Sequence, residues 1–321
     1  MRLKLVPDQT NLNFMGPWRL TFGLSCVLMV LSLVAFFSFG LNFGIDFRGG
    51  TSIRTEATQP LDIGGYRDAI APLGLGDITI SEVFDPTYGP ERNVATIRIQ
   101  AQDGSEAVTP EILTQVEVAL RAVDPTLTFS SVESVGPKVS GELVFEAIIA
   151  VAAALAAVLI YIWLRFEWQF ALGAVAALVH DIMLTIGVFS VLQLRFDLAI
   201  IAALLTIVGY SLNDTVVVFD RMRENLIKFK KRDLTEVMNL SLNETLSRTL
   251  MTSLTTLIAL ISLFVLGGDV IRGFVFAMIW GVVVGTWSSV YVAAVIVKRL
   301  GVRRDLGNGG DKAGTQFATS E

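Results

Sequence analysis

The sequence is poor in the residues from which enzyme active sites and metal centres are usually built. It has one cysteine and one histidine in 321 residues, and charged residues make up only 17%. A single cysteine excludes a disulfide within the chain, and no cluster of residues has metal-ligand spacing. There is no G-x-x-x-x-G-K-[ST] phosphate loop, and the only histidine lies in an apolar run, away from any Ser-His-Asp set. We therefore expect no enzyme activity, no metal and no cofactor.

Apolar residues, in contrast, are abundant: they make up 53% of the chain, and the mean hydropathy is +0.61. Runs near or above the ~20 residues that span a bilayer cover about 17–40, 143–164, 168–194, 198–220, 245–267 and 272–297. These runs predict six transmembrane helices. The first run is too long for a signal peptide and has no small-residue cleavage site after it, which predicts an uncleaved anchor.

The basic residues are concentrated in two short stretches, after the fourth and the sixth apolar run. They are Arg221, Arg223, Lys228, Lys230, Lys231 and Arg232, and then Lys298, Arg299, Arg303 and Arg304. Because short loops rich in Lys and Arg stay in the cytoplasm, we expect a cytoplasmic N-terminus (1–16), a cytoplasmic basic loop (221–244) and a disordered cytoplasmic tail (301–321). The basic loop suits anionic lipid or a cytoplasmic partner, and a nucleic-acid partner is disfavoured.

The segment 41–140, between the first two predicted helices, has the pattern of a small α+β domain. Apolar and polar residues alternate in four stretches, 51–58, 77–84, 93–100 and 127–134, and helical spacing occurs at 63–74 and after Pro110. The order β-α-β-β-α-β is typical of ferredoxin-like domains. The predicted fold is a six-helix membrane bundle, with helix one at 17–40 and helices two to six within 141–300, carrying a periplasmic ferredoxin-like domain at 41–140.

Glycine-containing motifs flank this domain on both sides. FGIDFRGGT (43–51) contains Gly49 and Gly50, and VGPKVSGE (135–142) contains Gly136 and Pro137. Glycine permits sharp turns, so we interpret these four residues as hinges between domain and bundle. In the last helix, Gly281 and Gly285 form a small-xxx-small pattern that lets helices approach closely, although such patterns also occur by chance.

Asp214, in the stretch GYSLNDTVVVFDRMREN (209–225), is the main candidate functional residue. A charge in the membrane interior costs about 2.5 to 3.5 kcal/mol on the mildest scale, and such residues usually face a bundle interior or a water path. The next helix carries Arg248, which we expect at the level of Asp214, where opposite charges would hold each other ionised. The alternative is a static structural pair.

A polar seam is expected beside this pair. Thr252, Thr255 and Thr256 follow Arg248 at three- and four-residue spacing, and Asn213 lies on the stripe predicted to face them. Together they could line a path for protons. The alternative is that the hydroxyls bond back to carbonyls of their own helix.

His180 and Asp181 lie near the middle of the third predicted helix. Adjacent residues on a helix point about 100° apart, so we expect that the two side chains cannot share one face fully. Asp181 is a candidate second proton carrier. His180 is interpreted either in the same way or as a neutral, hydrogen-bonded core histidine.

Five strings together resemble the SecD/SecF family of bacterial protein-translocase subunits, and within it the SecF branch. They are FGIDFRGGT, VGPKVSGEL, HDIMLTIG, GYSLNDTVVVFDRMREN and SLNETLSRTLMTSLTTL, and the resemblance covers about residues 7 to 300. Proton-driven exporters of the same resistance-nodulation-division superfamily are expected to share the bundle plan but not these strings.

The resemblance implies a function that spacing alone does not give. It implies a multi-pass inner-membrane subunit that acts with SecD, uses the proton-motive force, and promotes late translocation and release of secreted proteins. The implied partners are SecD, the SecYEG channel, YajC, the translocating secretory protein and membrane lipid. The family's membrane aspartate and arginine map onto Asp214 and Arg248. Two other readings of the residues remain: half of a small-molecule exporter, and a non-transporting scaffold.

Overall fold

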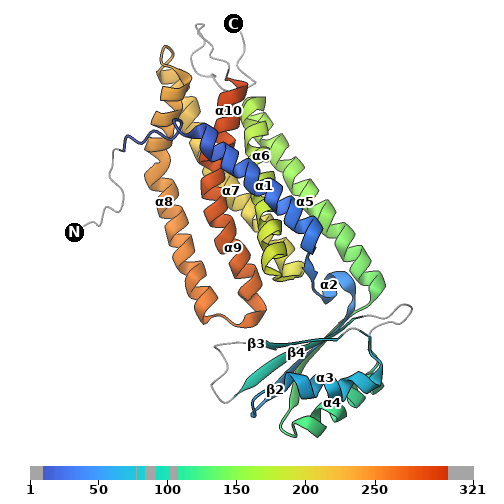
Figure 1. Cartoon of the computed structure of the whole chain (residues 1–321). Coiled ribbons are helices and arrows are strands. Elements are labelled where there is room, and N and C mark those ends of the chain that lie inside the picture. Colours follow the sequence, from blue (N-terminus) through green and yellow to red (C-terminus); the bar gives the residue numbers. More distant parts are fainter. Residues whose placement is uncertain (1–9, 77, 84–91, 101–107, 303–321) are drawn as a thin grey trace, which may run out of the picture.

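The protein is a long helical bundle with a small α+β domain at one end (Figure 1). This computed structural model describes residues 10–76, 78–83, 92–100 and 108–302. Most of the expected disordered tail, with Arg303 and Arg304, lies outside the described residues. Both described ends of the chain lie at the end of the bundle opposite the α+β domain; we call this the terminal end.

Among the described residues, six helical segments are long and apolar enough to cross a membrane, as the apolar runs predicted. They are α1 (Trp18–Phe39), α5 (Pro137–Arg165), α6 (Trp168–Leu192), α7 (Leu198–Lys228), α8 (Leu234–Leu266) and a last segment made of α9 (Asp269–Ser288), η2 (Ser289–Ala293) and α10 (Ala294–Leu300). The segment η2 is a turn of π-helix, wider than the α-helix on either side of it.

The segment 221–244 is not a loop, contrary to expectation. Helix α7 continues to Lys228 and α8 begins at Leu234, so only residues 229–233 connect them. The charged residues of the segment sit on helical turns that extend beyond the apolar runs. Hydropathy marks where the apolar layer ends, and a helix can continue past that point when its polar residues find partners.

The α+β domain has the expected ferredoxin-like order. Its elements are β2 (Gly50–Ala57), α3 (Ile63–Ile70), η1 (Ala71–Leu73), β3 (Ile78–Val83), β4 (Asn93–Gln100), α4 (Pro110–Val123) and β5 (Thr128–Val135). The sheet order is β3-β4-β2-β5, with antiparallel neighbours throughout. Alternation places Ile53, Ile97 and Ile99 in a core with α3 and α4, which cover the face of the sheet away from the bundle (Figure 1).

The chain enters this domain through a segment that is tied to the bundle. Strand β1 (Asn42–Phe43) pairs in parallel with β6 (Arg195–Phe196), which lies between α6 and α7. The short helix α2 (Ile45–Arg48) follows, and Gly49 and Gly50 then turn the chain at φ of 73° and 124°. Both values favour glycine, so the sharp turn expected from this pair is present.

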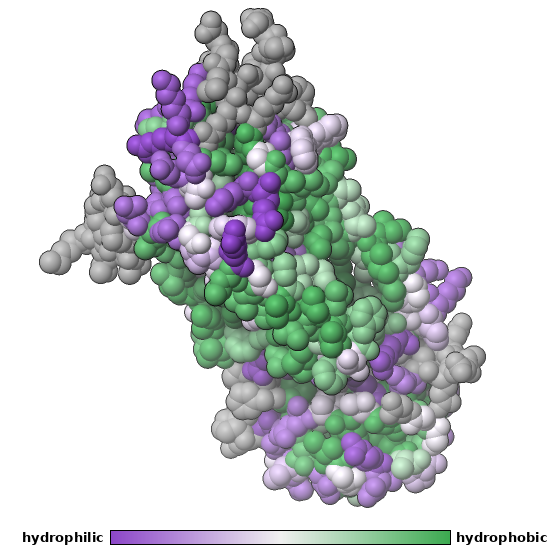
Figure 2. Space-filling model, turned by 45° about the horizontal axis from the view of Figure 1, so that its top comes forward, coloured by the Kyte–Doolittle hydropathy of each residue, from purple (hydrophilic) through white to green (hydrophobic). Residues whose placement is uncertain are grey.

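Two apolar clusters form the core of the bundle. One lies toward the terminal end and contains Phe166, Phe170 and Phe219; the other lies toward the α+β domain and contains Phe189 and Phe196. The face shown in Figure 2 has a broad apolar band between the hydrophilic terminal end and the mixed surface of the α+β domain. This distribution matches a protein whose middle section is surrounded by lipid.

Close packing of α7 on α9 depends on the two glycines of the small-xxx-small pattern. A methyl group at Gly281 would collide with Ile207, and one at Gly285 would press against Ser211. The pattern therefore marks a real helix contact here, which brings the polar residues of α7 and α9 together.

Candidate functional site

The most deeply buried acidic group of the described bundle is Asp181 on α6. It is fully buried, and its carboxylate accepts hydrogen bonds from Ser211 Oγ of α7 at 2.6 Å and Ser288 Oγ of α9 at 2.9 Å. His180 Nδ1 lies 3.0 Å from the other carboxylate oxygen. Asp181 thus joins three membrane helices through one side chain.

His180 and Asp181 are in contact although adjacent residues of a helix cannot share one face fully. Their Cβ atoms do point in different directions, but both residues are completely buried, and the imidazole reaches around to the carboxylate. His180 Nε2 is buried without a hydrogen-bond partner among the described residues. Only one ring nitrogen of the histidine, the one that faces the aspartate, therefore has a hydrogen-bond partner.

The sequence interpretation missed the two serines that hold Asp181. Ser211 lies three residues before Asp214, so the two lie close together on α7. Ser288 ends α9, immediately before the π-helical turn η2. A π-turn inside a membrane helix often marks a functional site. A serine on each of two apolar helices was the available signal, but pairing them with Asp181 needed the helix packing.

Asp214 is also buried, yet it is poorly satisfied. Its side chain is 4% exposed, and Oδ2 has no hydrogen-bond partner within the described structure. Burying a polar atom without a partner is costly. Such a site persists in proteins mainly where function requires it, so this orphan oxygen supports the choice of Asp214 as a candidate.

Arg248 lies at the same depth as Asp214 but is not in direct contact with it. Each residue is 14 positions from the end of its helix at the 229–233 turn, which corresponds to about 21 Å. Arg248 is close enough to act electrostatically on Asp214, but the two form no ion pair in the structure. The guanidinium is exposed on the outer face of α8.

The threonine seam on α8 does not face the bundle interior, contrary to expectation. Thr252 donates to the carbonyl oxygens of Arg248 and Thr249, and Thr255 donates to those of Met251 and Thr252. This is the back-bonding alternative. Thr255 is exposed, as is Asn213 on α7, whereas Thr256 is half-buried and accepts a long contact of 3.5 Å from Tyr210. Thr252 is also half-buried, so the polar stripe lies at the edge of the helix contact, and only Thr255 and Asn213 reach the outer surface of this chain.

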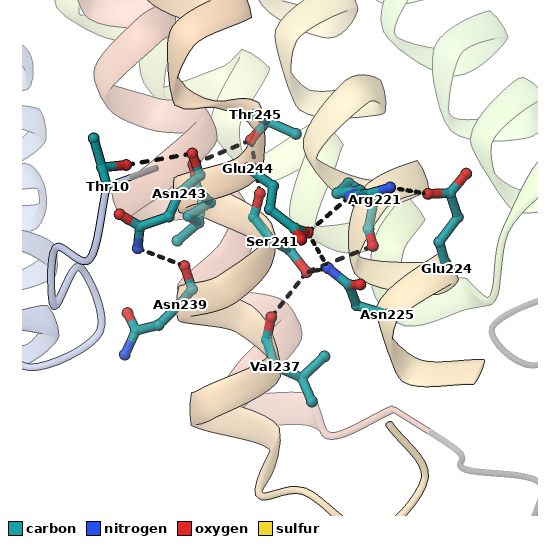
Figure 3. Close-up of polar contacts among 11 residues, drawn as sticks. Thr10, Arg221, Glu224, Asn225, Val237, Asn239, Ser241, Asn243, Glu244 and Thr245 are labelled. Carbon is teal, nitrogen blue, oxygen red and sulfur yellow. Dashed lines mark hydrogen bonds and ion pairs between the residues drawn. The ribbon is translucent and has the colours of Figure 1, made fainter. Parts of the chain in front are cut away.

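Charged residues at the terminal end of α7 form a network with α8 (Figure 3). Arg221 Nε donates to Glu244 at 2.7 Å, and Arg221 also pairs with Glu224. Asn225 donates to the same Glu244 oxygen at 2.6 Å and to Ser241 at 3.0 Å. This network joins the two helices one to three turns closer to the terminal end than Asp214 and Arg248.

Residues 10–17 form a strap across α8, and Thr10 donates to the Asn243 carbonyl oxygen (Figure 3). Two asparagine side chains of α8 hold the strap. The Asn243 amide accepts from Leu12 N and donates to Leu12 O, both at 2.8 Å. One turn earlier, Asn239 accepts from Met15 N at 2.9 Å. The strap therefore fixes the start of α1 to the helix that carries Arg248.

At the opposite end, the FGIDFRGG motif caps α7. Asp46 Oδ2 accepts from Leu198 N, the first residue of α7, at 3.0 Å, and Gly44 N donates to Phe196 O at 2.8 Å. Asp46 thus satisfies a free helix N–H group from another part of the chain. The expected hinge at Gly49 and Gly50 is therefore preceded by a fixed contact with the helix that carries Asp214.

A second link between domain and bundle crosses a cleft of about 630 Å³ under the sheet, which both charged and apolar residues line. Arg54 on β2 pairs with Asp269 at the start of α9 at 3.4 Å. Burial, together with the neighbouring Arg195, lowers the pKa of Arg98 on β4. In contrast, Gly136 and Pro137 simply join β5 to α5.

Comparison with protein families decides the identity. The family described as "Protein export membrane protein SecD/SecF, C-terminal" matches residues 115–303, and the SecD/SecF GG motif matches residues 34–61. The chain belongs to the SecD/SecF family. The GG motif is the segment that contains Asp46, Gly49 and Gly50, so the family signature coincides with the contact between domain and α7.

The curated relatives place the chain with the SecF subunits of that family. It is 63% identical to the "Protein translocase subunit SecF" of Cereibacter sphaeroides over 99% of this chain and 98% of the relative. It is 59% identical to the same subunit of Rhodobacter capsulatus over 95% and 93%. These values cover nearly the full length of both SecF proteins.

Solved SecDF structures have the same fold. The chain matches the crystal structure of SecDF, a translocon-associated membrane protein from Thermus thermophilus, with a TM-score of 0.82 and 35% identity over 92% of this chain and 39% of that one. The super-membrane-facing form of SecDF gives a TM-score of 0.67 at 36% identity, again over 39% of that chain. The chain therefore corresponds to less than half of SecDF, and SecD is the implied partner.

The described residues contain no group of three or more His, Cys, Asp or Glu arranged to hold a metal. What the membrane section offers is the buried carboxylates of Asp181 and Asp214, the second incompletely hydrogen-bonded, and a cation at the depth of Asp214. Such groups can take up and release protons and change the electrostatic attraction between helices.

Proposed function

We propose that this SecF-type subunit works with SecD as a proton-driven accessory to the Sec preprotein translocase. In this proposal both termini are cytoplasmic, the α+β domain is periplasmic, and the membrane is the bacterial inner membrane. The complex promotes late translocation and release of secreted proteins, alongside the SecYEG channel and YajC. The observation that carries the proposal is Asp214, an acidic group buried in the membrane section with one oxygen unpartnered.

Protonation of Asp214 would remove a negative charge from the space between α7 and α8. The attraction to Arg248 would then be lost, and the two helices could shift. One proton moving with the field supplies about 2.3 kcal/mol per 100 mV, and a few kcal/mol suffice to change the populations of two conformations. Asp181 is the second proposed carrier, since its protonation would weaken hydrogen bonds that join three helices.

The shift reaches the periplasmic domain by two contacts. The Asp46 cap joins the start of α7 to the segment that enters the domain, and the Arg54–Asp269 pair joins β2 to α9. Turning of the domain takes place at Gly49 and Gly50 on entry and at Gly136 and Pro137 on exit.

The outer face of α7 and α8 is the proposed surface for SecD. It exposes Arg248, Asn213 and Thr255 within the membrane section. A charged or polar group that faces lipid is costly, whereas the same group can be satisfied against another membrane subunit. The hypothesis of a small-molecule exporter loses support, because the relatives that match over nearly their full length are SecF subunits.

The test is Asp214→Asn, which keeps the size of the side chain but cannot ionise. We expect this variant to accumulate and to copurify with SecD at near wild-type levels, yet to lose the gradient-dependent increase in export. The assay is translocation of a secreted reporter into inverted vesicles, with and without a proton gradient, at matched protein levels. Arg248→Met should also lose the gradient-dependent increase, and Arg248→Lys should retain part of it.

The matched control is Asp220→Asn, on the same helix. Asp220 is half-exposed and pairs with Arg165 at 3.4 Å near the terminal end, so its loss should leave the gradient-dependent increase unchanged. A full increase with Asp214→Asn would mean that Asp214 is structural, as in the scaffold reading.

A further inference from the structure

An apolar cavity of about 430 Å³ lies between α1, α6 and α9 in the membrane section. Helix α1 packs along α6 and crosses η2, and the cavity lies beside this crossing. Its walls include Leu24, Leu28, Leu31, Leu184, Val283 and Trp287. Leu24, Leu31 and Val283 are exposed on the surface of the chain, so the cavity opens toward the surrounding membrane.

A cluster of cations lies at the terminal end of the same helices. Arg19, Lys298 and Arg299 lie 5.5, 5.6 and 4.5 Å from the centre of the Trp18 ring. None of the three forms an ion pair with a carboxylate among the described residues. Three like charges around one indole repel one another, and an anion between them would relieve this repulsion. Tryptophan and basic residues are typical of the membrane interface.

The cavity and the cation cluster are parts of one continuous surface along α1. Leu24 and Leu31 are 6 and 13 residues beyond Trp18, which places them about 9 and 20 Å along the helix. One leaflet of the hydrocarbon core is about 15 Å thick. Trp287 Nε1 donates to Ser25 Oγ at 3.0 Å, and its ring lies 4.5 Å from Tyr291 in η2, so aromatic side chains line the path between the two parts.

We propose that this surface binds an anionic phospholipid. Its phosphate lies among Arg19, Lys298 and Arg299, and one acyl chain fills the cavity. A basic site for the headgroup at the end of an apolar cavity fits a lipid and does not fit a free anion. A cavity of about 430 Å³ is too small for a transmembrane helix, which is about 10–12 Å across.

The bound lipid has a consequence for the buried carboxylate site. His180 lines the cavity, and its Nδ1 contacts Asp181. An acyl chain in the cavity keeps water away from this side of the histidine. Lipid binding thus isolates the His180–Asp181 pair from the membrane-facing surface.

The test uses quenching of tryptophan fluorescence by brominated lipids. Trp163→Phe with Trp168→Phe leaves Trp18, Trp280 and Trp287, all on or beside the proposed site. The full chain is reconstituted in phosphatidylcholine bilayers that contain the same small fraction of either brominated phosphatidylglycerol or brominated phosphatidylcholine. We expect stronger quenching by brominated phosphatidylglycerol. Each removed basic residue should lower the affinity for phosphatidylglycerol about fivefold.

The key variant replaces Arg19, Lys298 and Arg299 with Gln in the same background. Both lipids should quench its tryptophan fluorescence equally, whereas Arg299→Lys alone should keep the stronger quenching by phosphatidylglycerol that the parent shows. The matched control replaces Lys230, Lys231 and Arg232 with Gln, which removes three charges elsewhere at the terminal end and should keep the preference. Equal quenching by both lipids in the parent, or a preference that survives in the key variant, would refute the proposal. Absence of quenching by either lipid would also refute it and would indicate that protein covers the cavity.

Discussion

Removal of the Asp46 side chain should loosen the first turn of α7 without unfolding the bundle. Asp46→Ala deletes the acceptor for Leu198 N, which lies 3.0 Å away. Loss of a capping side chain costs about 0.5–2 kcal/mol, and the carboxylate adds about 0.3–1 kcal/mol through its interaction with the helix dipole. Because Leu198 is partly exposed, we expect the low half of the combined range, about 1 kcal/mol.

This cost should be local. A loss of about 1 kcal/mol in the free energy of local opening speeds amide exchange about fivefold at the start of α7. The measurement is hydrogen–deuterium exchange of peptides that cover residues 195–205, in the full-length protein in lipid nanodiscs. Asp46→Asn keeps an acceptor but loses the charge, so its exchange should be intermediate.

The matched control is Asp62→Ala, which deletes another capping aspartate. Asp62 accepts from Gly65 N at 2.8 Å at the start of α3, within the α+β domain. It should speed exchange in α3 and leave α7 unchanged. If Asp46→Ala leaves the exchange at the start of α7 unchanged, the GG-motif contact does not hold the helix, and the proposed link between domain and α7 is wrong.

Two further predictions concern the α+β domain and the orientation of the chain. Residues 50–136 should fold alone with mixed α/β circular dichroism, and a random-coil spectrum would contradict the self-contained core. Burial and the neighbouring Asp124 raise the pKa of Tyr66 from its ordinary 10.0 to about 12. Because the unfolded state loses this proton first, the stability of the domain should fall as pH rises from 10 to 12. Tyr66→Phe should remove this part of the pH dependence. In a Cys26→Ala background, a membrane-impermeant maleimide added outside intact spheroplasts should label Gln115→Cys and not Lys230→Cys, and the reverse pattern would overturn the orientation.

The fold was largely predictable because its signals are local. Each apolar run, alternating stretch or helical stretch indicates the structure of its own segment without reference to the rest of the chain. The bounds of β4 agree with prediction to the residue. The 221–244 segment was mispredicted because hydropathy does not register polar contacts such as Arg221 with Glu244. Those contacts let both helices extend beyond the apolar layer.

The candidate site was predictable in part. A carboxylate in an apolar run is conspicuous, so Asp181 and Asp214 were found and are both buried. Which face of α8 packs against the bundle was not predictable, because a stripe of threonines can lie on either the buried or the exposed face of a helix. Ser211 and Ser288 were missed for the same reason: their role depends on a third helix.

The strap across α8 has a consequence for how this protein can change during evolution. Asn243 binds the main-chain N–H and C=O groups of Leu12, and Asn239 binds the main-chain N–H group of Met15. Every residue type except proline offers the same pair of main-chain groups. Exposed strap positions other than Asn13, whose side chain accepts from Asn239 Nδ2 at 3.1 Å, are therefore free to change in sequence. The two asparagines of α8 are not: aspartate at 243 would lose the donor, and alanine would lose both contacts. Divergent strap sequences among relatives that keep both asparagines would be the mark of this arrangement.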